Sequence, residues 1–177
     1  MRSLILLLLL ACGTVAPSRR LYDKLGNPVA WDHPTLTWTF NCGFPESLKE
    51  PWRAGFAYWN TVPDGLPRFK ELACDCVCID VTPDILITPA YQDAEPEKVA
   101  TTFIDQRGKF ATHANVVYYS EWATFPEDTQ ISVARHEAGH VLGIGHNPNG
   151  GCLMFPIIWR NDGLKNACPE ELMVLQR

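Results

Sequence analysis

The sequence lacks a run of basic residues, an internal repeat, a low-complexity tract and, beyond its N-terminal segment, a long apolar stretch. Its 15 lysines and arginines are outnumbered by 20 acidic residues, which gives a formal net charge of −5 and argues against a nucleic-acid-binding protein. The shortage of apolar runs excludes a polytopic membrane protein. What is present is 177 residues, of which 46% are hydrophobic and 11% aromatic. That is enough for one folded domain and excludes a wholly disordered chain.

The N-terminal segment has the pattern of an export signal. A short positive start is followed by an apolar stretch from Leu4 to Ala11, which is too short to span a bilayer. The string Leu-Leu-Ala-Cys12 resembles a bacterial lipobox, and an ordinary signal peptide cut after Ala16 is the alternative. The sequence therefore predicts a signal peptide over residues 1–11, and a lipid anchor at Cys12 with a polar tether over residues 12–30. The protein would be exported and attached to the bacterial outer membrane or cell surface, or else secreted or periplasmic.

Seven cysteines are an odd number for an exported chain, and a lipid anchor at Cys12 leaves six. Disulfides are expected among them because exported proteins meet an oxidising environment. Three of the six, at positions 74, 76 and 78, alternate along the chain. Each is expected to bond to one of the other three, which are distant in the sequence, in a pairing that the sequence leaves open. A metal–thiolate cluster of the alternating cysteines is the alternative. The six are Cys42, Cys74, Cys76, Cys78, Cys152 and Cys168.

The hydrophobic pattern predicts an α+β domain over residues 31–177, with helices packed against one sheet. Trp52, Phe56 and Trp59 fall at i, i+4 and i+7 and mark the buried face of the first helix. The expected strands are 35–40, 69–72, 84–88 and 109–120, and the expected helices are 50–61, 126–142 and 170–176.

One motif carries chemistry, and it reads His-Glu-Ala-Gly-His-Val-Leu-Gly-Ile-Gly-His from His136 onward. His136 and His140 lie four residues apart on a predicted helix, so they project from one face and can bind one zinc ion. A turn at Gly143 can bring His146 back as a third ligand. Three nitrogen ligands leave a fourth position to water, whose pKa zinc lowers to about 7. Glu137 can take the proton of that water as a general base, so the motif predicts a catalytic zinc site.

This motif resembles the signature of the metzincin metalloproteases, His-Glu-x-x-His-x-x-Gly-x-x-His. The family also has a methionine turn, and Met154 in the string Cys-Leu-Met-Phe-Pro resembles the turn of the matrixins, the matrix-metalloprotease group. The expected first strand, first helix and third strand are similar to theirs as well. The resemblance implies a zincin-like fold with one twisted mixed β-sheet, about three helices and a Met-turn in which Met154 forms a packing floor.

The resemblance implies a zinc metalloendopeptidase that hydrolyses peptide bonds of extended protein substrates through a zinc-bound water and Glu137, with one catalytic Zn²⁺ and no evident calcium site. Substrate would pair with an edge strand within residues 101–114. Pro156, Ile157 and Ile158 would form a wall of an apolar specificity pocket. We expect a monomer that acts on proteins or peptides, binds no nucleic acid and meets the membrane only through its lipid anchor. The alternative is a non-catalytic, zinc-containing surface lipoprotein that binds peptides.

A few residues depart from the family pattern or leave alternatives open. Asn147 follows the third histidine, where matrixins usually have Ser or Thr and the archaemetzincins, a minor alternative, have Cys. Pro156 stands where some other metzincins have a metal-binding tyrosine, so no fifth ligand is expected. The string Cys42-Gly-Phe-Pro-Glu resembles the cysteine switch of matrixin pro-segments, but it lies inside the expected domain, and a structural half-cystine is favoured. His113 is interpreted as a packing or solvent-facing residue, with a second metal site or a substrate contact as the alternative.

Overall fold

The computed structural model of the chain describes residue 21 and residues 28–62, 66–73, 82–90, 99–158 and 162–175. The expected signal peptide, Cys12 and the alternating cysteines of residues 74–78 lie outside these residues. Within the described ranges, no helix is both long enough and apolar enough to cross a membrane.

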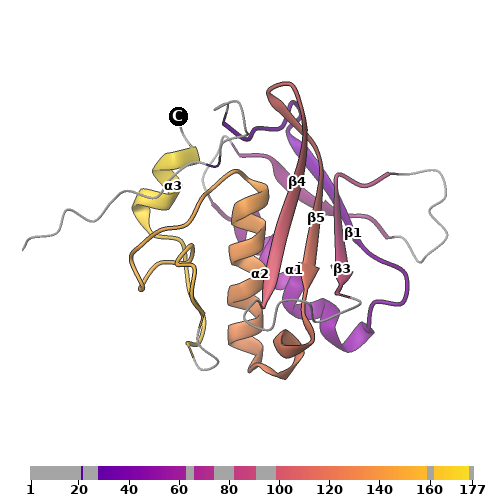
Figure 1. The fold of residues 1–177 in the computed structure, drawn as a ribbon, viewed down its shortest axis with the longest axis vertical. Helices are drawn as coiled ribbons and strands as arrows, with labels where there is room; N and C mark the ends of the chain where they lie inside the picture. The colour runs from indigo at the N-terminus through magenta and orange to yellow at the C-terminus, as the bar shows by residue number, and fades with distance from the viewer. Residues whose placement is uncertain are drawn as a thin grey trace, which may run out of the picture.

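A five-stranded β-sheet forms the framework of the domain (Figure 1). The strands lie in the order β2-β1-β3-β5-β4. Neighbours are parallel except at one end, where β4 runs antiparallel to β5. The expected mixed sheet is therefore confirmed, and β4 forms one of its edges. The strands are β1 (Thr35–Phe40), β2 (Arg68–Glu71), β3 (Ile85–Pro89), β4 (Ala100–Arg107) and β5 (Phe110–Tyr118).

Three α-helices accompany the sheet in the described part of the chain, which confirms the α+β class. Short 3-10 turns that the sequence pattern did not indicate precede the first two. At the crossing of these two helices, a Cβ on Gly55 would collide with the side chain of Ala134, so the close approach requires a glycine. The helices are α1 (Lys49–Asn60), α2 (Glu127–Val141) and α3 (Pro169–Leu175), and the 3-10 turns are Glu46–Leu48 and Ser120–Thr124.

Aromatic side chains fill the space between α1 and the sheet. Trp52, Phe56 and Trp59 are completely buried, as their helical spacing predicts. The ring of Phe56 lies 4.8 Å from that of Trp38 on β1, centroid to centroid, and such pairs add about 0.5–1.5 kcal/mol beyond the area they bury. The indole N–H of Trp59 donates a hydrogen bond of 2.8 Å to the carbonyl of Arg135 on α2. The core therefore fixes α2, which carries the histidine motif.

A disulfide joins Cys152 to Cys168, and their Cα atoms lie 5.3 Å apart. The expectation that each of these two bonds to one of the alternating cysteines at 74–78 is therefore wrong. The chain after α2 folds back and brings the start of α3 beside Cys152, a proximity that cysteine spacing alone does not encode. A cross-link over a separation of 16 residues stabilises a fold by about 3 kcal/mol and here holds α3 near the end of the motif.

Candidate active site

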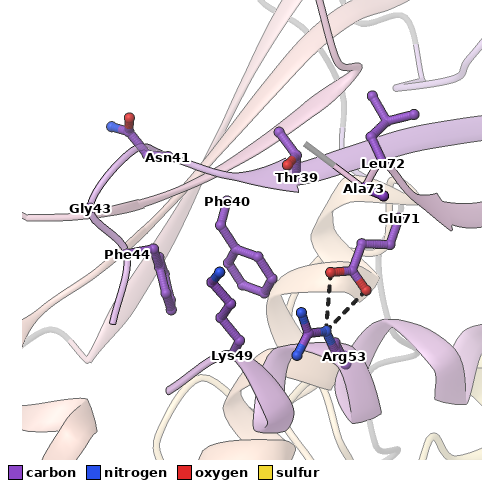
Figure 2. Close-up of a pocket in the computed structure, with 10 residues that line it drawn as sticks. All are labelled: Thr39, Phe40, Asn41, Gly43, Phe44, Lys49, Arg53, Glu71, Leu72 and Ala73. Atoms are coloured by element: carbon purple, nitrogen blue, oxygen red, sulfur yellow. Dashed lines mark hydrogen bonds and ion pairs between the residues drawn. The ribbon is translucent and has the colours of Figure 1, made fainter. Parts of the chain in front are cut away.

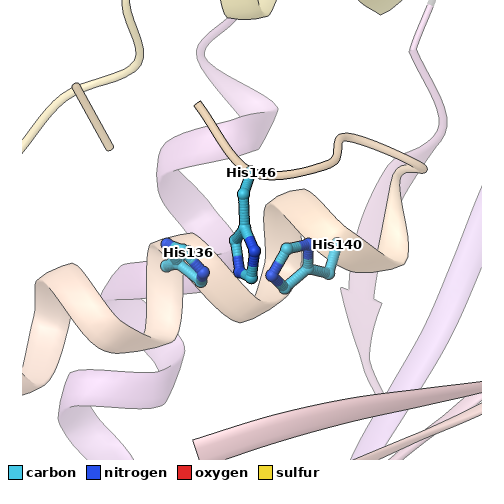
Figure 3. A group of neighbouring side chains, drawn as sticks. All are labelled: His136, His140 and His146. Atoms are coloured by element: carbon cyan, nitrogen blue, oxygen red, sulfur yellow. The ribbon is translucent and has the colours of Figure 1, made fainter. Parts of the chain in front are cut away.

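Three histidines from α2 and from the segment that follows it converge on one point. His136 and His140 project from the same face of α2, and His146 reaches back toward them (Figure 3). The ring centroids lie 4.6 Å apart for His136 and His140, 4.9 Å for His140 and His146, and 5.4 Å for His136 and His146. One nitrogen from each ring lies within 4.8 Å of the others, so the group can hold a single metal ion.

The chain reverses at Gly143, where φ is +88°. The N–H of Gly143 donates to the carbonyl of His140 over 2.8 Å, and the N–H of Ile144 donates to that of Gly139 over 3.0 Å, which ends α2. A Cβ on Gly143 would also lie 2.7 Å from the carbonyl oxygen of Val29. Both the dihedral angle and the contact therefore require glycine, and the turn predicted there is confirmed.

Gly143→Ala is expected to destabilise the protein more than Gly108→Ala does. Gly108 has a φ of +64° but nothing within 4 Å of an added Cβ, so its replacement costs only the left-handed backbone conformation, about 1–2 kcal/mol. Gly143→Ala adds the clash with Val29 and displaces His146, which weakens zinc binding. Denaturant unfolding and zinc titration of both variants measure the difference. Equal losses of stability with unchanged zinc affinity would contradict this account.

Backbone carbonyls orient two of the three rings. Nδ1 of His136 lies 2.8 Å from the carbonyl oxygen of Leu153, and Nδ1 of His140 lies 2.7 Å from that of Ile144. A carbonyl can only accept, so each Nδ1 carries the proton and Nε2 keeps its lone pair. Burial lowers the pKa of both side chains, that of His136 well below its usual value. It lowers the pKa of His146 too, so burial favours in all three rings the neutral form that binds zinc.

Glu137 follows the first histidine and is buried, with 5% of its surface exposed. Burial raises the pKa of its carboxyl group to about 7, and a hydrogen bond from Thr102 opposes that rise. The donor is Oγ1 of Thr102 on β4, which lies 2.6 Å from Oε2 of Glu137. A carboxyl group with a pKa near neutrality can both take up and release a proton under physiological conditions. The sequence motif pointed to Glu137, whereas nothing in it pointed to Thr102.

Met154 is completely buried against α2. A Cβ on Gly139 would lie 2.5 Å from its sulfur, so this glycine leaves room for the methionine against α2. The carbonyl of Met154 accepts a hydrogen bond of 2.8 Å from the N–H of Asn147. The methionine is therefore fixed at its backbone as well as by packing.

Glu171 on α3 holds the segment that contains Asn147 and Met154 by hydrogen bonds, and the sequence pattern did not indicate this role. The residue is completely buried, and its Oε1 accepts hydrogen bonds from the N–H of Met154 at 2.9 Å and from the side-chain amide of Asn147 at 3.0 Å. Its Oε2 accepts one from the N–H of Cys168 at 2.8 Å. Asn147, which departs from the matrixin pattern, thus supplies a donor to a buried carboxylate. The asparagine at this position was the one indication in the sequence of an additional hydrogen bond here, although it did not identify Glu171 as the acceptor.

A cavity of about 500 Å³, here termed the histidine cleft, opens beside these residues. The three histidines, Glu137, the first three residues of β4 and the residue before them line it, and Pro156, Ile157 and Ile158 form another part of its wall. Leu21 also lines the cleft, and its N–H donates a hydrogen bond of 2.7 Å to the carbonyl of Gly143. Leu21 lies in the range expected to be a tether, and no sequence signal indicated this contact.

The edge strand expected within residues 101–114 is β4, but the range is partly wrong. Residues 110–114 belong to β5, which lies between β3 and β4 in the sheet. The tight turn after Arg107 divides the range into two strands, and no other strand in the described part of the chain pairs with the outer edge of the first.

Two other residues considered from the sequence lie away from the histidine cleft. His113 on β5 has its Nδ1 at 3.2 Å from the carbonyl oxygen of Pro83, and it does not line the cleft. Cys42 is exposed and does not line the cleft either. The structure therefore brings neither of them to the three histidines.

A second hollow of about 480 Å³ lies at the end of β1 (Figure 2). Its basic side chains already face carboxylates: Nε of Arg53 lies 3.0 and 3.1 Å from the two oxygens of Glu71, and Nζ of Lys49 lies 2.6 Å from Glu46. The residues that line it include no histidine, so the histidine cleft remains the candidate site.

Comparison with known proteins agrees with this geometry. The matrixin family model of peptidase family M10 matches residues 30–169, a range that contains the sheet, α1, α2 and all three histidines. No curated protein matches the chain. Because the family model covers most of the chain, the chain belongs to the matrixins, a family of zinc-dependent metalloendopeptidases.

Proposed function

We propose that the protein cleaves peptide bonds in extended protein substrates, with zinc held by His136, His140 and His146 and with Glu137 as the general base. The observation that carries the proposal is the convergence of three imidazoles beside a buried carboxyl group in an open cleft. Three histidine nitrogens are a ligand set that zinc prefers, and three protein ligands leave a coordination position for catalysis. The carboxyl group beside them supplies the base that such a site requires.

The chain's own residues provide the proton transfers. A zinc ion at this site would lower the pKa of a coordinated water to about 7 and polarise the scissile carbonyl. Glu137 accepts the proton of the attacking water and then delivers it to the leaving amine. Its pKa of about 7 without the metal, a consequence of burial, suits a group that performs both transfers.

Substrate recognition would use the free edge of β4. An extended peptide can join an unpaired strand edge through main-chain hydrogen bonds, while alternate side chains enter pockets. Pro156, Ile157 and Ile158 line the histidine cleft, and their apolar surfaces favour a hydrophobic side chain of the substrate. Ile157 is 48% exposed, so apolar surface is available for such a contact.

Metal content and cleavage of a peptide library test the proposal together. The purified protein should hold about one zinc ion per chain and cleave unstructured peptides. Treatment with 1,10-phenanthroline should abolish cleavage and lower the melting temperature, because a ligand present at 100 times its Kd stabilises a fold by about 2.7 kcal/mol. The non-chelating isomer 1,7-phenanthroline is the matched control. A protein that holds zinc yet leaves the library intact would contradict the proposed endopeptidase activity.

We also propose that the protein is exported and attached by a lipid at Cys12, and that it acts on its substrate as a monomer. The lipobox-like string at Cys12 supports the anchor. The disulfide between Cys152 and Cys168 supports export, because such bonds persist in oxidising compartments.

A further inference from the structure

β4 carries a polar residue at a position where packing alone favours an apolar one. Ala100 and Ile104 are partly buried and pack against the core. Side chains two residues apart share a face of a strand, so Thr102 lies between them on the same face. That face is covered by α2, which lies beside β4 in Figure 1. The hydroxyl group of Thr102 therefore meets α2 at the general base.

The hydroxyl group holds one oxygen of the base. Oγ1 of Thr102 donates to Oε2 of Glu137 over 2.6 Å, the length of a charge-assisted O–H···O⁻ bond. The main-chain oxygen of Glu137 is farther from it, at 3.3 Å. Among the residues that the structure describes, this hydroxyl is the only hydrogen-bond donor to the Glu137 carboxylate. A buried carboxylate with a single donor takes its orientation from that donor.

We propose that Thr102 is a positioning residue for the reaction. By engaging Oε2, it leaves Oε1 of Glu137 available to accept the proton of the attacking water. The same residue belongs to the strand whose free edge the substrate would join, so it connects the base directly to the substrate-binding strand. This inference rests on the proposed function and adds a residue to it.

Steady-state kinetics of three variants test the role. Thr102→Val removes the hydroxyl group at nearly constant volume and should lower kcat about 10- to 100-fold, with KM within about threefold of wild type and about one zinc ion retained. Thr102→Ser keeps the hydroxyl group and should restore kcat to within about threefold of wild type. Thr112→Val makes the same change at an exposed site on β5, where the hydroxyl group donates a hydrogen bond to the carbonyl of Asp105, and should leave kcat unchanged.

A second measurement is independent of activity. In the metal-free protein, Thr102→Val should lower the melting temperature by several degrees, because a buried carboxylate loses its donor. In a Glu137→Ala background the same substitution should have a much smaller effect, since no carboxylate remains to be held. Equal shifts in the two backgrounds would assign Thr102 to packing alone and overturn the proposal. If the valine variant does not fold, Thr102→Ala replaces it in both measurements.

The outcomes separate this inference from the proposed function. A wild-type protein that cleaves no peptide overturns the proposed function and the positioning role with it. Wild-type cleavage together with an unchanged kcat for Thr102→Val overturns the positioning role alone. Loss of zinc from Thr102→Val, or a loss of kcat that Thr102→Ser does not restore, would also overturn it, because either result describes a structural residue.

Discussion

Glu137→Ala is expected to lower kcat/KM for peptide cleavage by about 10²- to 10⁴-fold, the range that a general base contributes. The variant should retain about one zinc ion per chain, because the three histidines and their carbonyl partners are untouched. It should also fold at least as well as wild type, since alanine removes a buried carboxyl group that has only one hydrogen-bond donor. The measurements are cleavage of a defined peptide, zinc content and thermal unfolding.

Glu127→Ala is the matched control for this substitution. Glu127 lies in the first turn of the same helix and is exposed, so its loss should leave cleavage within about twofold of wild type. A Glu137→Ala protein that retains zinc and still cleaves at the wild-type rate would refute the assignment of the base. A variant that loses its zinc would show instead that Glu137 holds the metal site together.

Glu171→Ala is expected to cost about 3–5 kcal/mol of the free energy of unfolding, because three donors lose a buried charged acceptor at once. Two of them are the main-chain N–H groups of Met154 and Cys168, which have no side-chain freedom to seek another partner. The segment under the histidines should loosen, so zinc affinity should fall about 10- to 100-fold, as it does when outer partners of a metal site are removed. Denaturant unfolding of the metal-free protein and zinc titration measure the two effects separately.

Glu170→Ala provides the comparison on the same helix. Glu170 is only partly buried, and its replacement should change the free energy of unfolding by less than about 1 kcal/mol and leave zinc affinity unchanged. If Glu171→Ala lowers the free energy of unfolding and the zinc affinity no more than Glu170→Ala does, the three hydrogen bonds make no measurable contribution to the stability of the site. A large loss of stability without a loss of zinc affinity would show that the metal centre does not depend on α3.

The features that the sequence predicted well depend on neighbours along the chain. The face formed by Trp52, Phe56 and Trp59 follows from helical periodicity, and so does the common direction of His136 and His140. The turn at Gly143 follows from the backbone freedom of glycine. Each of these patterns is complete within a few residues, so one segment contains all the information.

The features that the sequence did not predict depend on contacts between distant segments. Thr102 donates its hydrogen bond to Glu137 across a separation of 35 positions, and a threonine in a strand is too common to indicate such a contact. In the sequence, Glu171 is an ordinary acidic residue in the first turn of a helix. Only its packing against Met154 makes it a buried hydrogen-bond acceptor. The predicted disulfide pairing was wrong for the same reason, because Cys168 approaches Cys152 only once α3 has docked.

The contacts of Glu171 also set the order in which the site can be completed. All three histidines and Glu137 precede Asn147, and 24 positions separate Asn147 from Glu171. During synthesis from its N-terminus, the chain therefore exposes all three histidines and Glu137 before the helix that supports them. Early in that process the histidines are present, but the hydrogen bonds from Asn147 and Met154 to Glu171 have not yet formed. The segment that contains Asn147 and Met154 gains its hydrogen bonds to Glu171 only after α3 has been synthesised.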